Sequence, residues 1–150
     1  AIGSDYEVFE EVNQTSFYYN IRENITLDLP TETEYDVAFG KYTDLVTVGD
    51  ITQEYLIYGA IQGNSLVYEV NEPFSEVKDE MFDVVRLSGE KNTIGWDWKN
   101  YSLEKGAYEI IEDKTYLISS NAAFKYKLRF VNFLNSAGQS GHPTFEWELL

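Results

Sequence analysis

The sequence predicts a mostly β protein with an antiparallel β-sandwich-like fold and one short helix. Short runs alternate apolar and polar residues, and turn residues separate these runs. Aromatic residues, which pack well on a pleated sheet, are abundant at 12 Tyr, 9 Phe and 3 Trp. The 150 residues are enough for one core, so we expect a single domain over 1–150, in which residues 1–34 carry the weakest pattern.

Each expected strand is an alternating or continuously apolar run that ends at turn residues. Two runs within 35–48 flank Gly40, and their residues expected in the core are Val37, Phe39, Leu45 and Val48. The remaining expected strands are a pair within 15–30, closed by Pro30, and runs at 54–61, 65–70, 108–111, 115–120, 124–130 and 145–149.

One segment, 71–86, follows a helical pattern instead. Asn71 or Ser75 is a suitable N-cap, and Pro73 and acidic residues lie in the expected first turn. Apolar residues then recur every three or four positions and form one face. They are Phe74, Val77, Met81 and Val84 or Val85. We expect this face, Met81 included, to pack in the core.

Cations occupy alternate positions near the C-terminus, at Lys125, Lys127 and Arg129. On a strand they share one face, as Glu146 and Glu148 do on the last run. If the two strands pair antiparallel, the opposed charges contribute about 0.2–1 kcal/mol per pair and fix the register. An anion-binding role for these cations is the alternative.

The only histidine, His142, precedes Pro143 in a Gly-rich segment between these two strands. We expect an exposed turn there. Two tryptophans, Trp96 and Trp98, are two residues apart and would share one face of a strand.

The charge and the motifs exclude several classes of function. A net charge of −15 repels nucleic acid and anionic lipid. No catalytic motif is present, and one His makes a catalytic triad improbable, so we do not expect an enzyme. There is no Cys for a thiolate metal site. The acids Asp44, Asp50 and Glu54 lie close together in the sequence, but their spacing matches no calcium-binding loop. We therefore expect no metal site.

Five motifs together resemble the HmuY family of surface or secreted lipoproteins of Bacteroidota. They are YDVAF at 35–39, IGWDWK at 94–99, TYLI at 115–118, YKLRF at 126–130 and G-HPTFEW at 141–147. The resemblance implies an all-β HmuY-type fold and a precursor anchored to the outer membrane through a lipidated Cys upstream of Ala1. It also implies capture of haem between axial His or Met side chains, and delivery of the haem to a TonB-dependent outer-membrane receptor.

The chain departs from this pattern because it holds one His, one Met and no Cys as axial donors. The candidate haem ligands are therefore Tyr101, Met81 and His142. A tyrosinate ligand needs a cation nearby, and Lys99 and Lys105 are near Tyr101 in the sequence. The aromatic residues expected to contact the ring are Tyr55, Tyr58, Trp96 and Trp98.

Two hypotheses about function follow. The first is an exported, HmuY-like lipoprotein that captures haem, or another flat apolar ligand, for iron acquisition. The second is an accessory or interaction subunit of an outer-membrane transport or secretion complex, which keeps the fold but binds no haem. The shortage of His and Met favours the second hypothesis.

Overall fold

A computed structural model describes residues 6–8, 16–27, 31 and 33–150. Among these residues, nearly all of the regular structure is β. The strands are β1 Tyr6–Val8, β2 Ser16–Asn20, β3 Ile25–Leu27, β4 Val37–Val48, β5 Ile51–Gln62, β6 Leu66–Val70, β7 Lys99–Ser102, β8 Ala107–Ile110, β9 Thr115–Ser119, β10 Lys125–Leu134 and β11 Ser140–Leu149. A 3-10 helix, η1, covers Asp79–Asp83.

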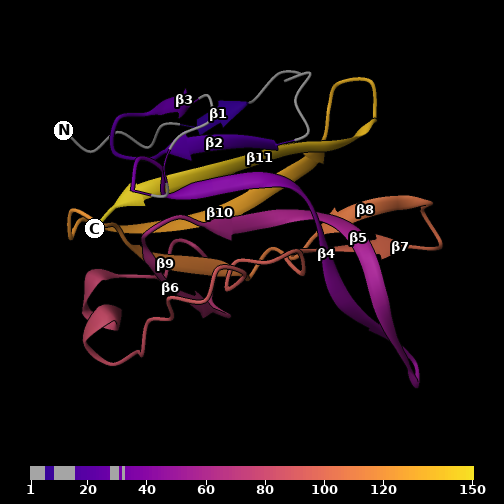
Figure 1. The fold of residues 1–150 in the computed structure, drawn as a ribbon, viewed down its shortest axis with the longest axis horizontal. Coiled ribbons are helices and arrows are strands. Elements are labelled where there is room, and N and C mark those ends of the chain that lie inside the picture. The colour runs from indigo at the N-terminus through magenta and orange to yellow at the C-terminus, as the bar shows by residue number, and fades with distance from the viewer. Residues whose placement is uncertain (1–5, 9–15, 28–30, 32) are drawn as a thin grey trace.

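These strands form two main sheets and one small hairpin, all with antiparallel pairing (Figure 1). The larger sheet has the order β1-β11-β10-β9-β6, the second sheet has β3-β2-β4-β5, and β7 pairs with β8 alone. The predicted mostly β fold is confirmed. The strand pair expected within 15–30 is present as β2 and β3, whereas Pro30 lies outside the described residues.

The core lies between the two main sheets and is largely aromatic. Phe39 of β4 stacks on Phe145 of β11 with ring centroids 5.2 Å apart, and it meets Phe130 of β10 edge-on at 5.9 Å. Tyr19 of β2 packs edge-on against Phe145 at 5.2 Å. All four rings are buried, so the aromatic contacts between the two sheets form the centre of the core.

The terminal strands β10 and β11 confirm the expected charge pairing. Lys127 lies opposite Glu148 and Arg129 lies opposite Glu146 in the register. The Lys127 amine is 3.2 Å from the Glu148 carboxylate, and the Arg129 guanidinium pairs with Glu146. Lys125 differs, since it pairs with Asp79 of η1 at 2.7 Å.

The helix predicted over 71–86 is reduced to the single turn of η1. None of the η1 residues is buried, Val84 is 84% exposed, and Val77 is the one fully buried member of the expected apolar face. The carbonyl oxygens of Phe74 and Val77 accept hydrogen bonds from the Lys127 amine at 3.0 and 3.1 Å, which attaches this segment to β10. No helix among the described residues has the length and apolar character needed to cross a membrane.

The β4–β5 hairpin extends well beyond the body of the protein (Figure 1). β4 runs as one continuous 12-residue strand through Gly40, and a tight turn at Gly49 and Asp50 connects it to β5. The prediction that Leu45 and Val48 lie in the core is wrong, since they are 62% and 70% exposed. Both belong to the outer half of the hairpin, which no second sheet covers.

Candidate functional site

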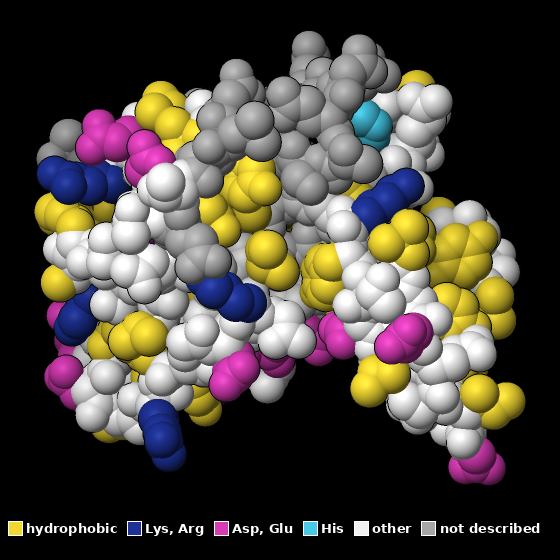
Figure 2. Space-filling model, in the orientation of Figure 1, with side chains coloured by type: hydrophobic (Ala, Val, Ile, Leu, Met, Phe, Trp, Pro, Cys, Tyr) yellow, Lys and Arg dark blue, Asp and Glu magenta, His cyan; other side chains and the backbone are white. Residues whose placement is uncertain are grey.

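An open cavity of about 740 Å³ lies between the outer part of the β4–β5 hairpin and the β7–β8 hairpin. This volume is within the range of about 300–1,000 Å³ that is usual for small-molecule sites. Apolar side chains gather at this end of the molecule, at the right of Figure 2. We call the cavity the aromatic pocket after its aromatic lining residues, Tyr55, Tyr58, Trp96, Tyr101, Tyr108 and Phe133.

Strand pairing and ring contacts connect the walls of the aromatic pocket. Tyr101 and Tyr108 lie directly opposite each other on β7 and β8, and their rings meet edge-on at 5.3 Å. Tyr108 meets Phe133 of β10 edge-on at 5.1 Å, and Phe133 contacts Tyr58 of β5 at 5.4 Å. A continuous set of rings therefore runs from the β7–β8 hairpin to the β4–β5 hairpin.

The turn that precedes β7 forms another part of the wall, and two glycines let it approach β5. Ala60 and Gly95 exchange backbone hydrogen bonds of 2.8 and 3.0 Å, and Gly95 adopts φ +66°. A Cβ at Gly59 would lie 2.7 Å from the Gly95 carbonyl oxygen, so only glycine fits without a shift at that position.

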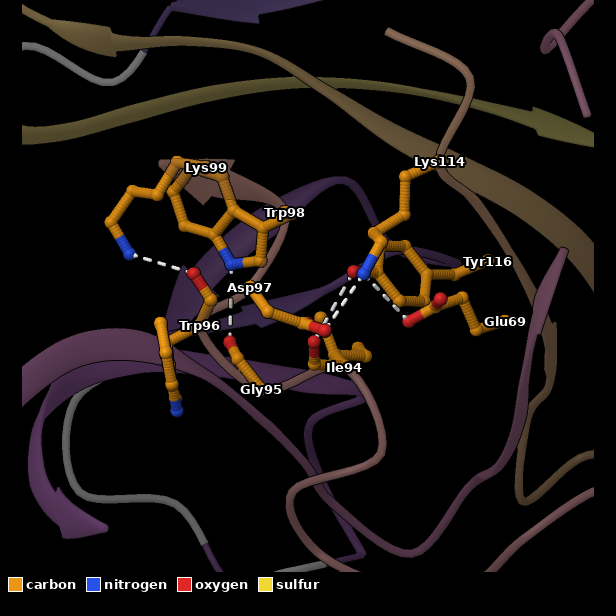
Figure 3. Close-up of polar contacts among 9 residues, drawn as sticks. All are labelled: Glu69, Ile94, Gly95, Trp96, Asp97, Trp98, Lys99, Lys114 and Tyr116. Atoms are coloured by element: carbon orange, nitrogen blue, oxygen red, sulfur yellow. Dashed lines mark hydrogen bonds and ion pairs between the residues drawn. The ribbon is translucent and has the colours of Figure 1, made fainter. Parts of the chain in front are cut away.

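This turn separates the two tryptophans that the sequence pattern placed on one strand face. Trp98 is 1% exposed and stacks on Phe130 with ring centroids 3.8 Å apart, and its Nε1 donates to the Gly95 carbonyl at 3.1 Å. Trp96 is half-buried and lines the aromatic pocket. Figure 3 shows the two indoles pointing away from one another. Trp98 is therefore a core residue, while Trp96 belongs to the pocket.

Side chains from the larger sheet hold the same turn from the other side (Figure 3). The Lys114 amine lies 2.8 Å from the Asp97 carboxylate and 3.1 Å from that of Glu69 on β6. The Tyr116 hydroxyl donates to the Ile94 carbonyl at 3.2 Å. The position of Trp96 thus depends on contacts made outside the pocket.

Lys99 supplies a buried cation to the aromatic pocket. Its Nζ donates to the carbonyls of Tyr58 at 2.5 Å and Trp96 at 3.1 Å, and it lies 4.2 Å from the centroid of the Trp98 ring. Burial lowers the pKa of Lys99 to about 8, and the negative charge of Asp97 opposes this shift. At neutral pH the amine is therefore mainly charged.

The pocket lining differs in charge from the rest of the chain. The chain has 26 acidic residues among its 150, yet none is among the described residues that line the aromatic pocket. The charged lining residues are Lys41 and Lys99. Lys41 and Lys99 therefore offer positive charge to a ligand that carries carboxylate groups.

Of the seven residues predicted from the sequence, the structure brings four together. These are Tyr55, Tyr58, Trp96 and Tyr101, which all line the aromatic pocket. Tyr101 lies on β7. Lys41, Lys99, Tyr108 and Phe133 were not predicted as site residues. Tyr108 could have been predicted from the sequence, because it lies in an expected strand just after the glycine turn at Gly106. A hairpin with this turn pairs it with Tyr101.

Met81 and His142 are not among the pocket-lining residues. Met81 lies on η1, in the 71–86 segment, and Figure 1 shows this segment and the β7–β8 hairpin at opposite ends of the long axis. The prediction that His142 lies in an exposed turn is wrong. Because β11 already begins at Ser140, His142 is a half-buried strand residue. Its Nε2 lies 3.5 Å from Nδ2 of Asn135.

Comparison with known proteins identifies the fold. No protein-family model and no curated protein sequence matches this chain. The apo HmuY analog (TFO) of Tannerella forsythia matches with a TM-score of 0.58 at 14% identity, over 99% of this chain and 96% of that one. The chain has the HmuY-like fold. A crystal structure from Bacteroides vulgatus, described as HmuY-like and heme binding, matches with a TM-score of 0.54 at 12% identity, over 88% of this chain and 83% of that one. The HmuY-like fold that the sequence motifs implied is thereby confirmed.

Proposed function

We propose that this protein is an exported binding protein that captures a flat, largely apolar ligand of the tetrapyrrole class, such as haem, in the aromatic pocket. The observation that carries the proposal is the pocket itself. Its six aromatic residues line a cavity of about 740 Å³ at one end of an HmuY-like fold. Flat apolar rings bind well between such side chains, and the two lysines suit the carboxylates of a tetrapyrrole.

Attachment to the outer membrane through an upstream lipidated Cys, and transfer of haem to a TonB-dependent receptor for iron acquisition, extend this proposal. Both come from the motifs that resemble the HmuY family. A cell-surface position suits a protein that takes a ligand from the surroundings and passes it to a transporter.

Titration of the protein with haemin, followed by visible absorption and by tryptophan fluorescence, tests the proposal. We expect saturable binding with quenching of the Trp96 indole, and we expect Trp96→Ala to weaken binding by about tenfold. Tyr68→Ala is the control, because Tyr68 is an aromatic residue 37% exposed on β6, outside the pocket. Absence of saturable binding by any porphyrin would remove the proposal.

A second function, that of an accessory subunit of an outer-membrane complex, is favoured by the end of the β4–β5 hairpin. Leu45, Val48 and Ile51 are each more than 60% exposed there, at 62%, 70% and 65%. Exposed apolar groups on a projecting hairpin suit contact with a protein partner. The double variant Leu45→Ser/Ile51→Ser changes residues outside the pocket lining. Under this function the wild type binds no haem, and the double variant is expected to lose association with the outer-membrane complex.

A further inference from the structure

We infer that the aromatic pocket recognises an anionic tetrapyrrole through its ring faces and carboxylates, and that the protein does not ligate the metal. The pocket then takes metal-free porphyrin as readily as haem. This inference rests on the proposed function and specifies the ligand class of the same site.

The first step concerns the donors that usually bind haem iron, which are His, Met, Cys and Tyr. The chain has one His, one Met and no Cys. Met81 is on η1 at the far end of the molecule, and His142 is on β11 beside the amide of Asn135. Neither belongs to the pocket lining, so among the described lining residues the donors of this set are tyrosine hydroxyls.

The second step concerns these hydroxyls, because a tyrosine binds ferric iron as the tyrosinate. Burial raises the pKa of Tyr58 to about 12, which opposes formation of its anion. The Tyr55 hydroxyl accepts a hydrogen bond from the Gln53 amide, which is a neutral donor. Burial therefore opposes ligation by Tyr58, and Tyr55 receives no charged hydrogen-bond donor among the described residues.

Tyr101 was the tyrosine predicted as a ligand, with Lys99 and Lys105 as the cations expected to assist it. Neither lysine amine forms a hydrogen bond with the Tyr101 hydroxyl among the described residues. The Lys105 amine pairs with the Glu109 carboxylate, and the Lys99 amine donates to the carbonyls of Tyr58 and Trp96. The residues present therefore do not fit axial ligation of haem iron.

The third step concerns what the pocket does offer. Aromatic side chains line it from both hairpins and from the Trp96 turn, and they can contact the two faces of a flat macrocycle. Lys41 is exposed and Lys99 is buried, so positive charge is available at the surface and inside the pocket. Stacking and carboxylate recognition require no metal.

The test compares three probes on the same protein, which are haemin, protoporphyrin IX and protoporphyrin IX dimethyl ester. Fluorescence titration is expected to give dissociation constants for haemin and protoporphyrin IX within about threefold of each other. The dimethyl ester, whose carboxylates are blocked, is expected to bind at least about tenfold more weakly. In Tyr101→Phe and His142→Ala the ratio of the haemin constant to the protoporphyrin IX constant is expected to stay within about threefold, as in the wild type.

Lys99→Met and Lys41→Met test the carboxylate contact. They are expected to weaken binding of the free acid and to leave the dimethyl ester unaffected, whereas Lys105→Met, outside the pocket, changes neither. Lys41 is exposed, so its variant is expected to fold even if Lys99→Met does not.

The outcomes separate this inference from the proposed function. Haemin binding more than about tenfold tighter than protoporphyrin IX, with the difference lost in Tyr101→Phe or His142→Ala, would overturn the inference and leave the proposed function standing. Equal binding of the dimethyl ester and the free acid would also overturn it. If no porphyrin binds, both the inference and the proposed function fall.

Discussion

The Lys114 amine lies 2.8 Å from the Asp97 carboxylate, and this contact links the turn that carries Trp96 to the start of β9. The same amine is 3.1 Å from Glu69, so one cation serves two carboxylates on different parts of the chain. The Lys114 side chain is 8% exposed, and Glu69 and Asp97 are 28% and 58% exposed. Of these three groups the lysine is the most buried, so removal of its charge is expected to lower the free energy of unfolding more than removal of either carboxylate.

Replacing Lys114 by Met is expected to lower the free energy of unfolding by about 1–2 kcal/mol, because two acidic groups lose their shared partner while water still reaches both of them. Urea unfolding measures this change. Lys105→Met is the control, since its pair with Glu109 is exposed on both sides, at 66% and 40%. Equal stability of Lys114→Met and Lys105→Met would contradict the assigned role of Lys114.

The two tryptophans of the IGWDWK motif are expected to respond differently to truncation. Trp98→Ala removes a fully buried ring that stacks on Phe130, and it is expected to cost about 3–5 kcal/mol of unfolding free energy. Trp96→Ala removes a half-buried pocket residue and is expected to cost less than about 1.5 kcal/mol. Thermal unfolding of both variants tests this order, which a larger loss in Trp96→Ala would contradict.

Alternation in the sequence predicted most of the longer strands and the opposition of basic and acidic faces on the two terminal strands, but it did not predict β1, β7 or the start of β11 at Ser140. Period-two spacing predicted that the cations of one strand face the acids of the other, and the regular register of both strands places Lys127 opposite Glu148. Tyr55 and Tyr58 lie in the strand predicted at 54–61, and Tyr101 was named as a candidate donor just after the IGWDWK motif. Four of the predicted contact or ligand residues therefore do line one pocket.

The parts that could not be predicted depend on contacts between distant segments. Trp96 and Trp98 diverge because Gly95 adopts a positive φ and pairs with Ala60, which ends the alternation. The 71–86 segment forms only the single turn of η1, and Lys127, 50 residues beyond Val77, binds a carbonyl oxygen of this segment, which no local pattern predicts. The buried amine of Lys99 likewise binds the carbonyls of Tyr58 and Trp96. These contacts cannot be predicted from the spacing of residues in the sequence.

Lys99 is expected to give the stability a characteristic dependence on pH. Burial lowers its pKa to about 8 in the folded chain, against an ordinary value of 10.5. Between these values the unfolded chain binds more protons than the folded chain, so this group makes the free energy of unfolding rise with pH from about 8 to about 10. Below that window the amine is charged in both states, and its contribution stays constant.

Urea unfolding of the wild type and of Lys99→Met at pH of about 7 and about 9.5 measures this contribution. The wild type is expected to gain stability relative to the variant at the higher pH, because other titrating groups cancel in the difference. Lys41→Met, an exposed lysine of the same pocket, is expected to follow the wild type. A constant difference between wild type and Lys99→Met would rule out the lowered pKa.

Lys127 is expected to determine how firmly the 71–86 segment is held on β10. Its side chain is 6% exposed, it pairs with Glu148, and it donates to the carbonyls of Phe74 and Val77. Lys127→Met is expected to lower the free energy of unfolding by about 2–3 kcal/mol, because it leaves one carboxylate and two carbonyl oxygens without this donor.

Hydrogen exchange of peptides within 71–86 is expected to accelerate more in Lys127→Met than exchange in β9 or β11. Lys125→Met is the matched control, since Lys125 also contacts this segment but through an exposed pair with Asp79. If both variants accelerate exchange equally, the buried amine is not what fixes the segment.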